Sequence, residues 1–331
     1  MKKIINNINS IITEELEGMQ KAYSNLIKVN YDPIFVTRTS KSSKVALISG
    51  GGSGHEPLHA GFVGYGMLDA ACPGEIFTSP TPDQMEEAVK SVNYEKGVVF
   101  LVKNYTGDVM NFQMAEDLCK AENIDVRSII IDDDVSVKNS LYTTGRRGVG
   151  ATVFFEKICG ASSERGDNID KVLEYANYCK ENARSMGMAL TSCTVPAVGK
   201  PTFDISDDEI EMGIGIHGEP GRERIKLISS QKIAETMMEA ICSDIPYKDG
   251  DEVICMINGM GATPLMELYI LYNDVQKIAE KKGIKIVRNL IGNYVTSIDM
   301  AGASISLIKV NDDILKLWDY PVHTVALRWG M

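Results

Sequence analysis

The first half of the chain alternates short apolar runs with amphipathic segments. A helix is predicted over residues 10–26, where apolar positions recur at helical spacing after a serine cap. Strand-length apolar runs follow at residues 45–48, 98–102 and 128–131, separated by helical patterns at 83–92 and 110–120. Strands that alternate with helices in this way predict a largely parallel sheet flanked by helices.

A second series of the same kind occupies the rest of the chain, after a long helical pattern at residues 168–186. Its predicted strands lie at residues 188–194, 210–216, 253–257, 284–289 and 305–310, with helices at 231–242 and 265–281 between them. A chain of 331 residues is long for a single core. We therefore expect two α/β domains with largely parallel or mixed sheets flanked by helices, one over residues 1–186 and one over 187–331.

Composition and charge narrow the class of protein. Apolar residues make up 44% and charged residues 24% of the chain, and no stretch is long and uncharged enough to cross a bilayer. The basic N-terminus is not followed by the apolar segment of a signal peptide, so we expect a cytoplasmic protein with no membrane partner. A net charge of −11 argues against nucleic acid as a partner. Seven scattered cysteines without a C-x-x-C pair predict reduced, mostly buried thiols.

A glycine-rich segment, GGGSGHEP at residues 50–57, directly follows the strand predicted there. Missing side chains allow positive φ and a close approach to a ligand, so backbone N–H groups around Gly52 and Ser53 could converge on oxygen atoms. Ligands of open α/β sheets bind at the carboxyl ends of strands, where this segment and His55 fall. The segment fits neither a P-loop nor the dinucleotide fingerprint. The alternative is a tight turn from strand to helix.

Two other sets of residues could suggest a metal site, but the sequence does not favour one. His59 stands four residues after His55 and could share a helical face with it, but without a third ligand a supporting or packing role is favoured. The aspartates at residues 132–134 are contiguous, so alternate side chains point in different directions. We expect capping and solvation for them, and no metal site.

A polar turn, KNYTGD at residues 103–108, follows the strand predicted at 98–102. Because it belongs to the same sheet as the glycine-rich segment, the two turns could face one pocket. Asp108 falls at or near a helix N-terminus, where capping is the ordinary explanation. Beside a histidine and the cation of Lys103, it is also the carboxylate that a hydroxyl-activating site needs as a general base.

His217 lies in a second glycine-rich segment, GIGIHGEPG at residues 213–221. The nominal G-x-G-x-x-G match is accidental, because no helix is predicted to begin on its last glycines. A neutral imidazole can attack a carbonyl carbon, so His217 is a candidate nucleophile. The alternative is a single histidine that closes a strand with a satisfied hydrogen bond.

A third loop, NGMGATP at residues 258–264, joins a predicted strand to a helix. Thr263 is the expected N-cap, with Pro264 in the first turn. Capping, together with subunit or domain contact, is favoured over anion binding.

Taken together, these segments resemble the dihydroxyacetone kinase family. The matching motifs cover essentially the whole chain and occur in the family's order, at residues 50–57, 103–108, 144–148, 215–221 and 258–264. The chain is similar to the K-type, substrate-binding subunit. The resemblance implies that a short-chain ketose is held as a hemiaminal on His217, with acid–base help from His55 and Asp108. Lys103 and the backbone at Gly52 and Ser53 would hold the substrate oxygens.

The resemblance also implies partners. The sequence ends at Met331 without the helical nucleotide domain of single-chain relatives, so no cofactor is expected on this chain. Nucleotide and magnesium are expected on a separate L-type subunit, which a phosphotransferase-system phosphocarrier recharges in many bacteria. A homodimer follows by family analogy. Leu58 departs from the smaller residue usual in the family, which affects the size of the pocket.

Two other functions remain open. A ketone-sensing paralogue would bind the substrate on His217 but act as a coactivator of a transcription regulator. The presence of His55 and Asp108 speaks against it. An ATP-dependent kinase in a single subunit is disfavoured by the missing nucleotide domain. The sequence does not distinguish dihydroxyacetone from glyceraldehyde or a four-carbon ketose.

Overall fold

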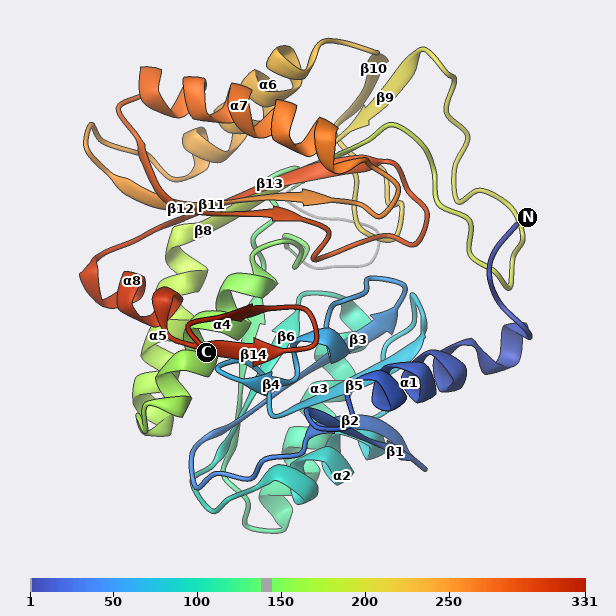
Figure 1. The fold of residues 1–331 in the computed structure, drawn as a ribbon, viewed down its shortest axis with the longest axis vertical. Coiled ribbons are helices and arrows are strands. Elements are labelled where there is room, and N and C mark those ends of the chain that lie inside the picture. The colour runs from blue at the N-terminus through green and yellow to red at the C-terminus, as the bar shows by residue number, and fades with distance from the viewer. Residues whose placement is uncertain (1, 138–144) are drawn as a thin grey trace. The chain divides into compact units, whose positions relative to one another are not determined.

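The computed structural model describes residues 2–137 and 145–331, which form two compact units (Figure 1). The first consists of Met1–Ile131, Thr152–Tyr178 and Ile314–Met331, and the second of Asp132–Ala151 and Cys179–Asp313. The sequence predicted one boundary between residues 186 and 187, whereas the chain passes between the units several times. The crossings after Ile131, Tyr178 and Asp313 lie in no Gly- or Pro-rich stretch that would mark them in the sequence.

The first unit is built on a six-stranded mixed sheet with the order β1-β2-β5-β3-β6-β7. Its strands are β1 (Ile27–Tyr31), β2 (Ile34–Arg38), β3 (Ala46–Ser53), β5 (Ala70–Ile76), β6 (Val98–Lys103) and β7 (Val126–Ile131). The last four of these pair in parallel, while β1 and β2 add an antiparallel edge. A smaller sheet joins β4 (Gly64–Tyr65), β14 (Val322–Thr324) and β15 (Arg328–Trp329).

Helices pack on and beside this sheet, and most of them have one apolar face to bury. They are α1 (Ile11–Ala22), α2 (Pro82–Val92), α3 (Thr106–Ala121), α4 (Thr152–Glu164), α5 (Ile169–Asn182), which continues into the second unit, and α8 (Asp312–Asp319); the short 3₁₀ turns are Ile8–Ser10 and Ala60–Phe62. The core between α2, α3 and the sheet includes Phe100 and Phe112, whose rings meet edge to face. The fully buried strand β6 thereby holds its carboxyl end in a fixed place.

The second unit has a six-stranded sheet with the order β10-β9-β8-β13-β11-β12. Its elements are β8 (Ala183–Ala189), β9 (Glu209–Met212), β10 (Glu223–Lys226), α6 (Ser230–Asp244), β11 (Glu252–Gly259), α7 (Leu265–Lys281), β12 (Lys285–Gly292) and β13 (Gly302–Lys309). Only β11 and β12 pair in parallel within this described sheet. Helices α6 and α7 pack on one face of it (Figure 1).

The α/β class with mixed sheets is therefore confirmed, but several elements differ from the prediction. The helix predicted to residue 186 ends at Asn182, and Ala183–Ala189 is strand β8. Helix α4 was not predicted, because its residues are buried on every side and leave no amphipathic period. Strands β1, β2 and β5 were also missed. Strands β1 and β2 are only five residues long and form the antiparallel edge, while Pro73 and Gly74 interrupt the apolar run of β5.

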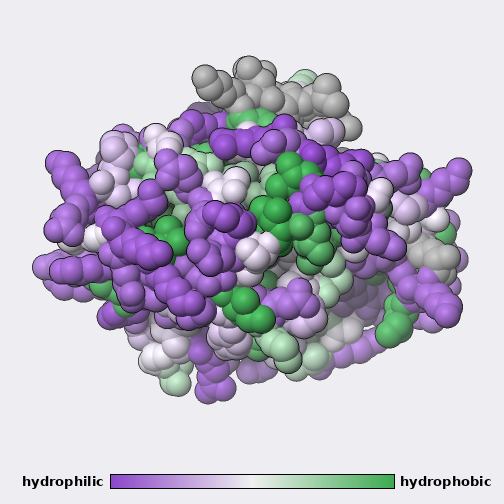
Figure 2. Space-filling view, turned by 90° about the horizontal axis from the view of Figure 1, so that it is seen from above, coloured by the Kyte–Doolittle hydropathy of each residue, from purple (hydrophilic) through white to green (hydrophobic). Residues whose placement is uncertain are grey.

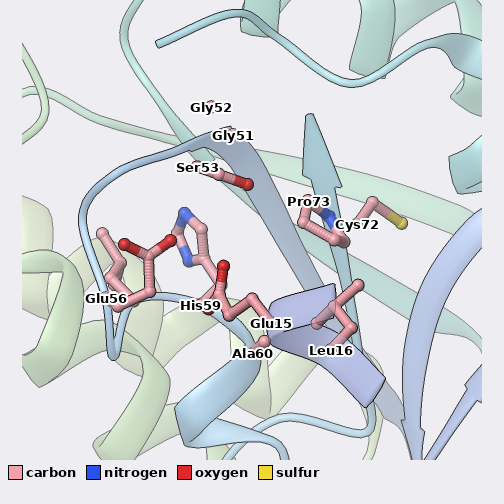
Figure 3. Close-up of a pocket in the computed structure, with 11 residues that line it drawn as sticks. Glu15, Leu16, Gly51, Gly52, Ser53, Glu56, His59, Ala60, Cys72 and Pro73 are labelled. Carbon is pink, nitrogen blue, oxygen red and sulfur yellow. The ribbon is translucent and has the colours of Figure 1, made fainter. Parts of the chain in front are cut away.

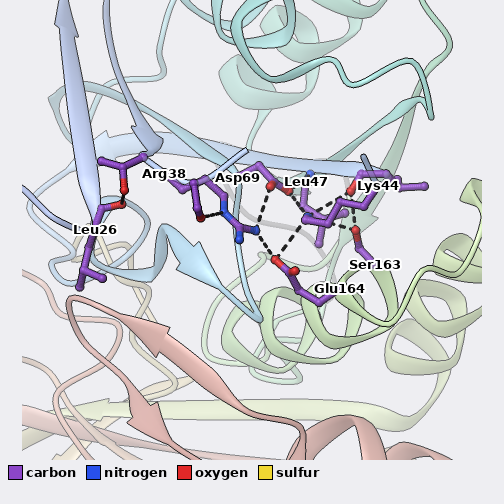
Figure 4. A network of polar contacts seen from close by, with 10 residues as sticks. Leu26, Arg38, Lys44, Leu47, Asp69, Ser163 and Glu164 are labelled. Carbon is purple, nitrogen blue, oxygen red and sulfur yellow. Dashed lines mark hydrogen bonds and ion pairs between the residues drawn. The ribbon is translucent and has the colours of Figure 1, made fainter. Parts of the chain in front are cut away.

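A buried ion network ties the sheet of the first unit to the end of α4 (Figure 4). Asp69 accepts from Arg38 at 3.3 Å and from Lys44 at 2.5 Å, and the carboxylate of Glu164 pairs with Arg38. All four side chains are at most 4% exposed. Because each charge has an opposite partner, the network fixes the positions of these elements without leaving an uncompensated buried charge.

The surface agrees with the acidic, polar composition. The side seen in Figure 2 is mostly hydrophilic, with apolar side chains in several separate places. Within the described residues, no helix has both the length and the apolar character that a membrane span requires. The seven cysteines, all within the described part, are free, and six of them are buried, as the sequence predicted.

Candidate functional site

The glycine-rich segment is largely strand rather than loop. Strand β3 continues through Ser53, and Gly54 alone among the described glycines of this segment has a left-handed backbone, with φ of +105°. The glycines at 50 and 52 serve close packing: an added Cβ would lie 2.5 Å from Cys72 O and 2.5 Å from Thr78 N, respectively. The prediction of a loop was wrong here because extended backbone also needs glycine where neighbours approach this closely.

Gly51 makes room for Lys103, the last residue of β6. An added Cβ on Gly51 would lie 2.2 Å from Nζ of Lys103, which is 1% exposed. The ammonium group donates to Gly50 O at 3.3 Å and lies 3.8 Å from Oδ2 of Asp108. Burial lowers the pKa of Lys103, while the carboxylates of Asp108 and Glu156 act to raise it. The two predicted turns therefore do meet at one place within the first unit.

Asp108 lies in the first turn of α3, after Tyr105 at the N-cap position. Its carboxylate is buried, and its Oδ1 atom has no hydrogen-bond partner among the described residues. A helix N-terminus favours a negative charge at this position. A buried oxygen without a partner is costly, so Oδ1 is well suited to accept a hydrogen bond from a hydroxyl group.

His55 is also buried in the first unit, at 1% exposure. Its ring stacks on Phe77, with centroids 5.0 Å apart and an interplanar angle of 15°. The hydroxyl of Ser53 donates to Gly74 O at 2.7 Å, which holds the end of β3 against β5. The proton of the Ser53 hydroxyl is therefore already engaged within the first unit.

A small cavity of about 10 Å³ lies beside these residues. Figure 3 shows Gly51, Gly52, Ser53 and His59 among the residues that line it. Glu56 and, from helix α1, Glu15 also line the cavity. Burial and the charge of Glu56 raise the pKa of Glu15 to about 8, and burial also raises the pKa of Glu56. Leu58, the departure noted in the sequence, is buried and lines the same cavity, so its size narrows the space there.

His59 and Glu156 are partners of Lys103 that sequence reasoning did not assign to the site. Nε2 of His59 lies 2.8 Å from Nζ of Lys103, and its Nδ1 lies 2.6 Å from Oε1 of Glu156 in α4. Burial lowers the pKa of His59 well below its usual value, and it raises the pKa of Glu156. The supporting role expected for His59 fits this placement. The only sequence signal for Glu156 was the charged pair Glu156-Lys157 between apolar residues.

In the second unit, His217 lies in the loop between β9 and β10. Strand β9 ends at Met212, four residues earlier than predicted, because Gly213 turns the chain with φ of +81°. Nδ1 of His217 lies 3.0 Å from Oε1 of Glu219, and the backbone N–H of His217 donates to Oε2 of Glu219 at 2.9 Å. No helix begins at the glycines of this described loop, in agreement with the accidental motif match.

The aspartates after β7 were wrongly expected to be capping and solvated. The carboxylate of Asp133 accepts from the backbone of Val149 and Ala151 at 2.8 Å, and burial raises its pKa to about 6. Asp134 pairs with Arg147, and both are buried. Across residues 2–137 and 145–331, no three His, Cys, Asp or Glu side chains are arranged to hold a metal ion.

The remaining motifs have structural partners. In the motif at residues 144–148, Thr144 lies outside the described residues. Arg146 of the same motif pairs with Asp244. Thr263 was expected to cap α7, but its hydroxyl bonds to the backbone of Gly302 and Pro264 takes the N-cap position. Asn258 likewise bonds the backbone of residues 294–295. This loop therefore joins neighbouring segments of the second unit.

The sequence and the fold are those of a family defined by the Dak1 domain. The Dak1 domain matches residues 17–326, and the chain belongs to this family. It is 46% identical, over the full length of both chains, to the dihydroxyacetone-binding subunit of the PEP-dependent dihydroxyacetone kinase of Escherichia coli. It is 48% identical to the corresponding PTS-dependent subunit of Lactococcus lactis, with 99% of each chain covered.

Solved structures agree with this membership. The dihydroxyacetone kinase of C. freundii superposes with a TM-score of 0.87 at 31% identity, covering 99% of this chain and 60% of that chain. A dihydroxyacetone kinase operon co-activator superposes with a TM-score of 0.88 at 36% identity, covering 97% of this chain and 98% of that one. The fold is thus shared by kinases and by a regulatory protein.

Proposed function

We propose that this chain is the dihydroxyacetone-binding subunit of a dihydroxyacetone kinase that depends on the phosphotransferase system. It binds dihydroxyacetone as a hemiaminal on His217 and presents a hydroxyl group for phosphorylation, which gives dihydroxyacetone phosphate. Relatives with this name are 46–48% identical over essentially the full chain. A covalent bond to the carbonyl carbon selects ketones over polyols such as glycerol, because a polyol has no carbonyl to attack.

The observation that carries the proposal is the pairing of Lys103 with Asp108. A buried ammonium and a buried carboxylate with an unsatisfied oxygen offer one donor for a substrate oxygen and one acceptor for a hydroxyl proton. Asp108 serves as the general base and His55 assists the same acid–base chemistry. Lys103 and the backbone of Gly52 and Ser53 hold the oxygens of the substrate.

The phosphoryl group comes from a separate L-type subunit that carries nucleotide and magnesium. A phosphocarrier of the phosphotransferase system recharges that nucleotide. The names of these relatives, which describe them as PEP- and PTS-dependent, support this arrangement. The chain itself binds no cofactor, acts in the cytoplasm and forms a homodimer.

Turnover tests the proposal. The chain is mixed with a charged L-type subunit and dihydroxyacetone, and the triose phosphate is measured with a coupled dehydrogenase. Product should form only when all three components are present, and glycerol should give none. Lack of product with a partner that is competent with another K-type subunit would overturn the proposal.

The co-activator that superposes at a TM-score of 0.88 supports a second candidate function. A ketone-sensing co-activator would form the adduct on His217 but give no product with any L-type partner. The kinase subunit ranks first, because identity to the named subunits exceeds the 36% identity to the co-activator. The same turnover assay separates the two.

A further inference from the structure

The carboxylate of Glu219, which contacts His217, lies beside the buried ion pair of Arg147 and Asp134. Nε and Nη2 of Arg147 each lie 2.7 Å from Oδ2 of Asp134, and Nη2 also donates to Gly213 O at 2.7 Å. Arg147 and Asp134 are at most 1% exposed. The guanidinium is therefore held at the base of the His217 loop from two directions.

Gly215 supplies the space in which Glu219 and Arg147 face each other. A Cβ added to Gly215 would lie 2.0 Å from Oε2 of Glu219 and 2.7 Å from Nη1 of Arg147. The backbone N–H of Gly215 also donates to Glu219 O at 3.1 Å. Glycine at this position thus allows both groups to occupy a gap that any other residue would fill.

Negative and positive charges alternate along Asp134, Arg147 and Glu219. Burial alone would raise the pKa of Glu219, but His217 and Arg147 outweigh it and the pKa falls to about 2. Glu219 is therefore an anion at neutral pH. An ionised carboxylate only accepts hydrogen bonds, so the nitrogen of His217 that faces it must carry a proton.

On the basis of the proposed function, we propose that Glu219, held by Arg147 and Asp134, is the positioning residue that makes Nε2 the nucleophilic nitrogen of His217. Its contact with Nδ1 at 3.0 Å selects the Nδ1–H tautomer, which leaves the ring lone pair on Nε2. The proposed roles of Gly215 and Arg147 are indirect, since neither acts on the substrate.

The step balances as follows. The Nε2 lone pair forms a bond to the carbonyl carbon, and the π pair of the C=O bond moves to the oxygen, which takes a proton from solvent. The ring becomes an imidazolium that keeps its Nδ1 proton. The carboxylate of Glu219 faces the charge that develops on the ring, in the way a buried carboxylate stabilises an imidazolium in acyl-transfer enzymes.

Nitrogen NMR on the full chain tests the tautomer directly. The chain has four histidines, so ¹⁵N-histidine labelling gives few ring signals, and His217→Ala assigns the pair that belongs to His217. In the unsubstituted protein Nδ1 should be protonated and Nε2 should carry the lone pair. Glu219→Gln should shift both signals toward a mixture of tautomers.

Glu211→Gln is the matched control. Glu211 is also buried, accepts from the backbone of Gly221 at 3.0 Å and pairs with Arg224, so the substitution disturbs the same loop by the same charge. It should leave the His217 ring signals in place. Gly215→Ala gives a second test, because it displaces Glu219 without changing any charge, and it should reproduce the effect of Glu219→Gln.

Adduct formation is measured separately with ¹³C-labelled dihydroxyacetone, whose ketone signal moves to the region of a saturated carbon. Glu219→Gln should slow the appearance of this signal about 10- to 100-fold, with no such loss in Glu211→Gln. Ring signals that do not respond to Glu219→Gln, or respond equally to Glu211→Gln, overturn the inference. An absent adduct in the unsubstituted protein, with ring signals that do respond, counts against the proposed function instead.

Discussion

Nε2 of His59 lies 2.8 Å from Nζ of Lys103, so a histidine that was not assigned to the site contacts its central cation. The opposite ring nitrogen lies 2.6 Å from Glu156. Because burial first, and then the charge of Lys103, keeps the pKa of His59 low, the ring stays neutral, with one nitrogen as donor and the other as acceptor. The ring thereby links the buried ammonium to a carboxylate on a different helix.

Removing this link should destabilise the first unit. His59→Phe leaves Lys103 and Glu156 buried without their shared partner, and we expect the free energy of unfolding to fall by about 3 kcal/mol or more. Urea denaturation measures it. His323→Gln, at a half-buried position of β14, is the control and should cost less than about 1 kcal/mol. Equal losses in both variants would contradict the linking role of His59.

Gly51→Ala should act on Lys103. The new Cβ would lie 2.2 Å from Nζ, so the ammonium must move away from the place where it meets a substrate oxygen. Affinity for dihydroxyacetone, measured by calorimetry, should fall about tenfold or more, in line with the loss of one charged hydrogen bond. In Gly18→Ala, inside α1, the Cβ meets nothing within 4 Å, so this control should keep full affinity and gain about 0.5–1 kcal/mol of stability.

Substitutions of the two histidines of the proposed mechanism should have different effects on adduct formation. His217→Ala removes the nucleophile and should abolish the covalent adduct, which crystallography of the soaked protein detects. His55→Ala should leave the adduct but slow phosphoryl transfer with the L-type partner, since His55 only assists the acid–base step. An equal loss of adduct in both variants would refute this division of roles.

Asp108→Asn tests the general base. The substitution keeps the size of the side chain but removes the basic oxygen, so turnover should fall about 10²- to 10⁴-fold while the adduct still forms. Asp117→Asn, at an exposed position on the same helix α3, should change turnover little. Turnover that survives in Asp108→Asn would assign the proton to another group.

The pair Glu15 and Glu56 predicts a pH dependence of stability. The folded protein holds a proton on Glu15 up to a pKa of about 8, whereas the unfolded chain releases it near 4.5. The free energy of unfolding should therefore fall as the pH rises from about 4.5 to 8. Glu15→Gln should flatten this fall and raise stability at pH 8. Glu14→Gln, exposed on the same helix, should retain it; an unchanged slope in Glu15→Gln would contradict the prediction.

The sequence predicted the elements that bury only one face. Helix α7 was predicted with its observed ends at residues 265 and 281, because its apolar residues recur along one face. Helix α4 was missed, since burial all round removes the period. The division of the chain was also not visible, because a return such as Ile314–Met331 to the first unit is decided by long-range packing that no local pattern carries.

For the site, residue type and position at strand ends were sufficient to select Lys103 and Asp108, which the structure brings together. The roles of Asp133 and Asp134 were misjudged, because a run of charges looks solvated until its partners from distant segments are known. Glu219 lies within the glycine-rich segment at residues 213–221, which the sequence singled out. Its contact with Nδ1 of His217 depends on how the loop turns at Gly218, where φ is +81°. The catalytic roles stay predictions until the variants are measured.

The last strands of the chain have a consequence for synthesis on the ribosome. Strand β14 pairs with β4, and Nζ of Lys157 in α4 donates to Leu317 O at 2.7 Å, so the first unit needs residues of the segment Ile314–Met331. The whole second unit leaves the ribosome before they do. The earliest residues to emerge must therefore wait, incompletely packed, while a later part of the chain already has all its strands.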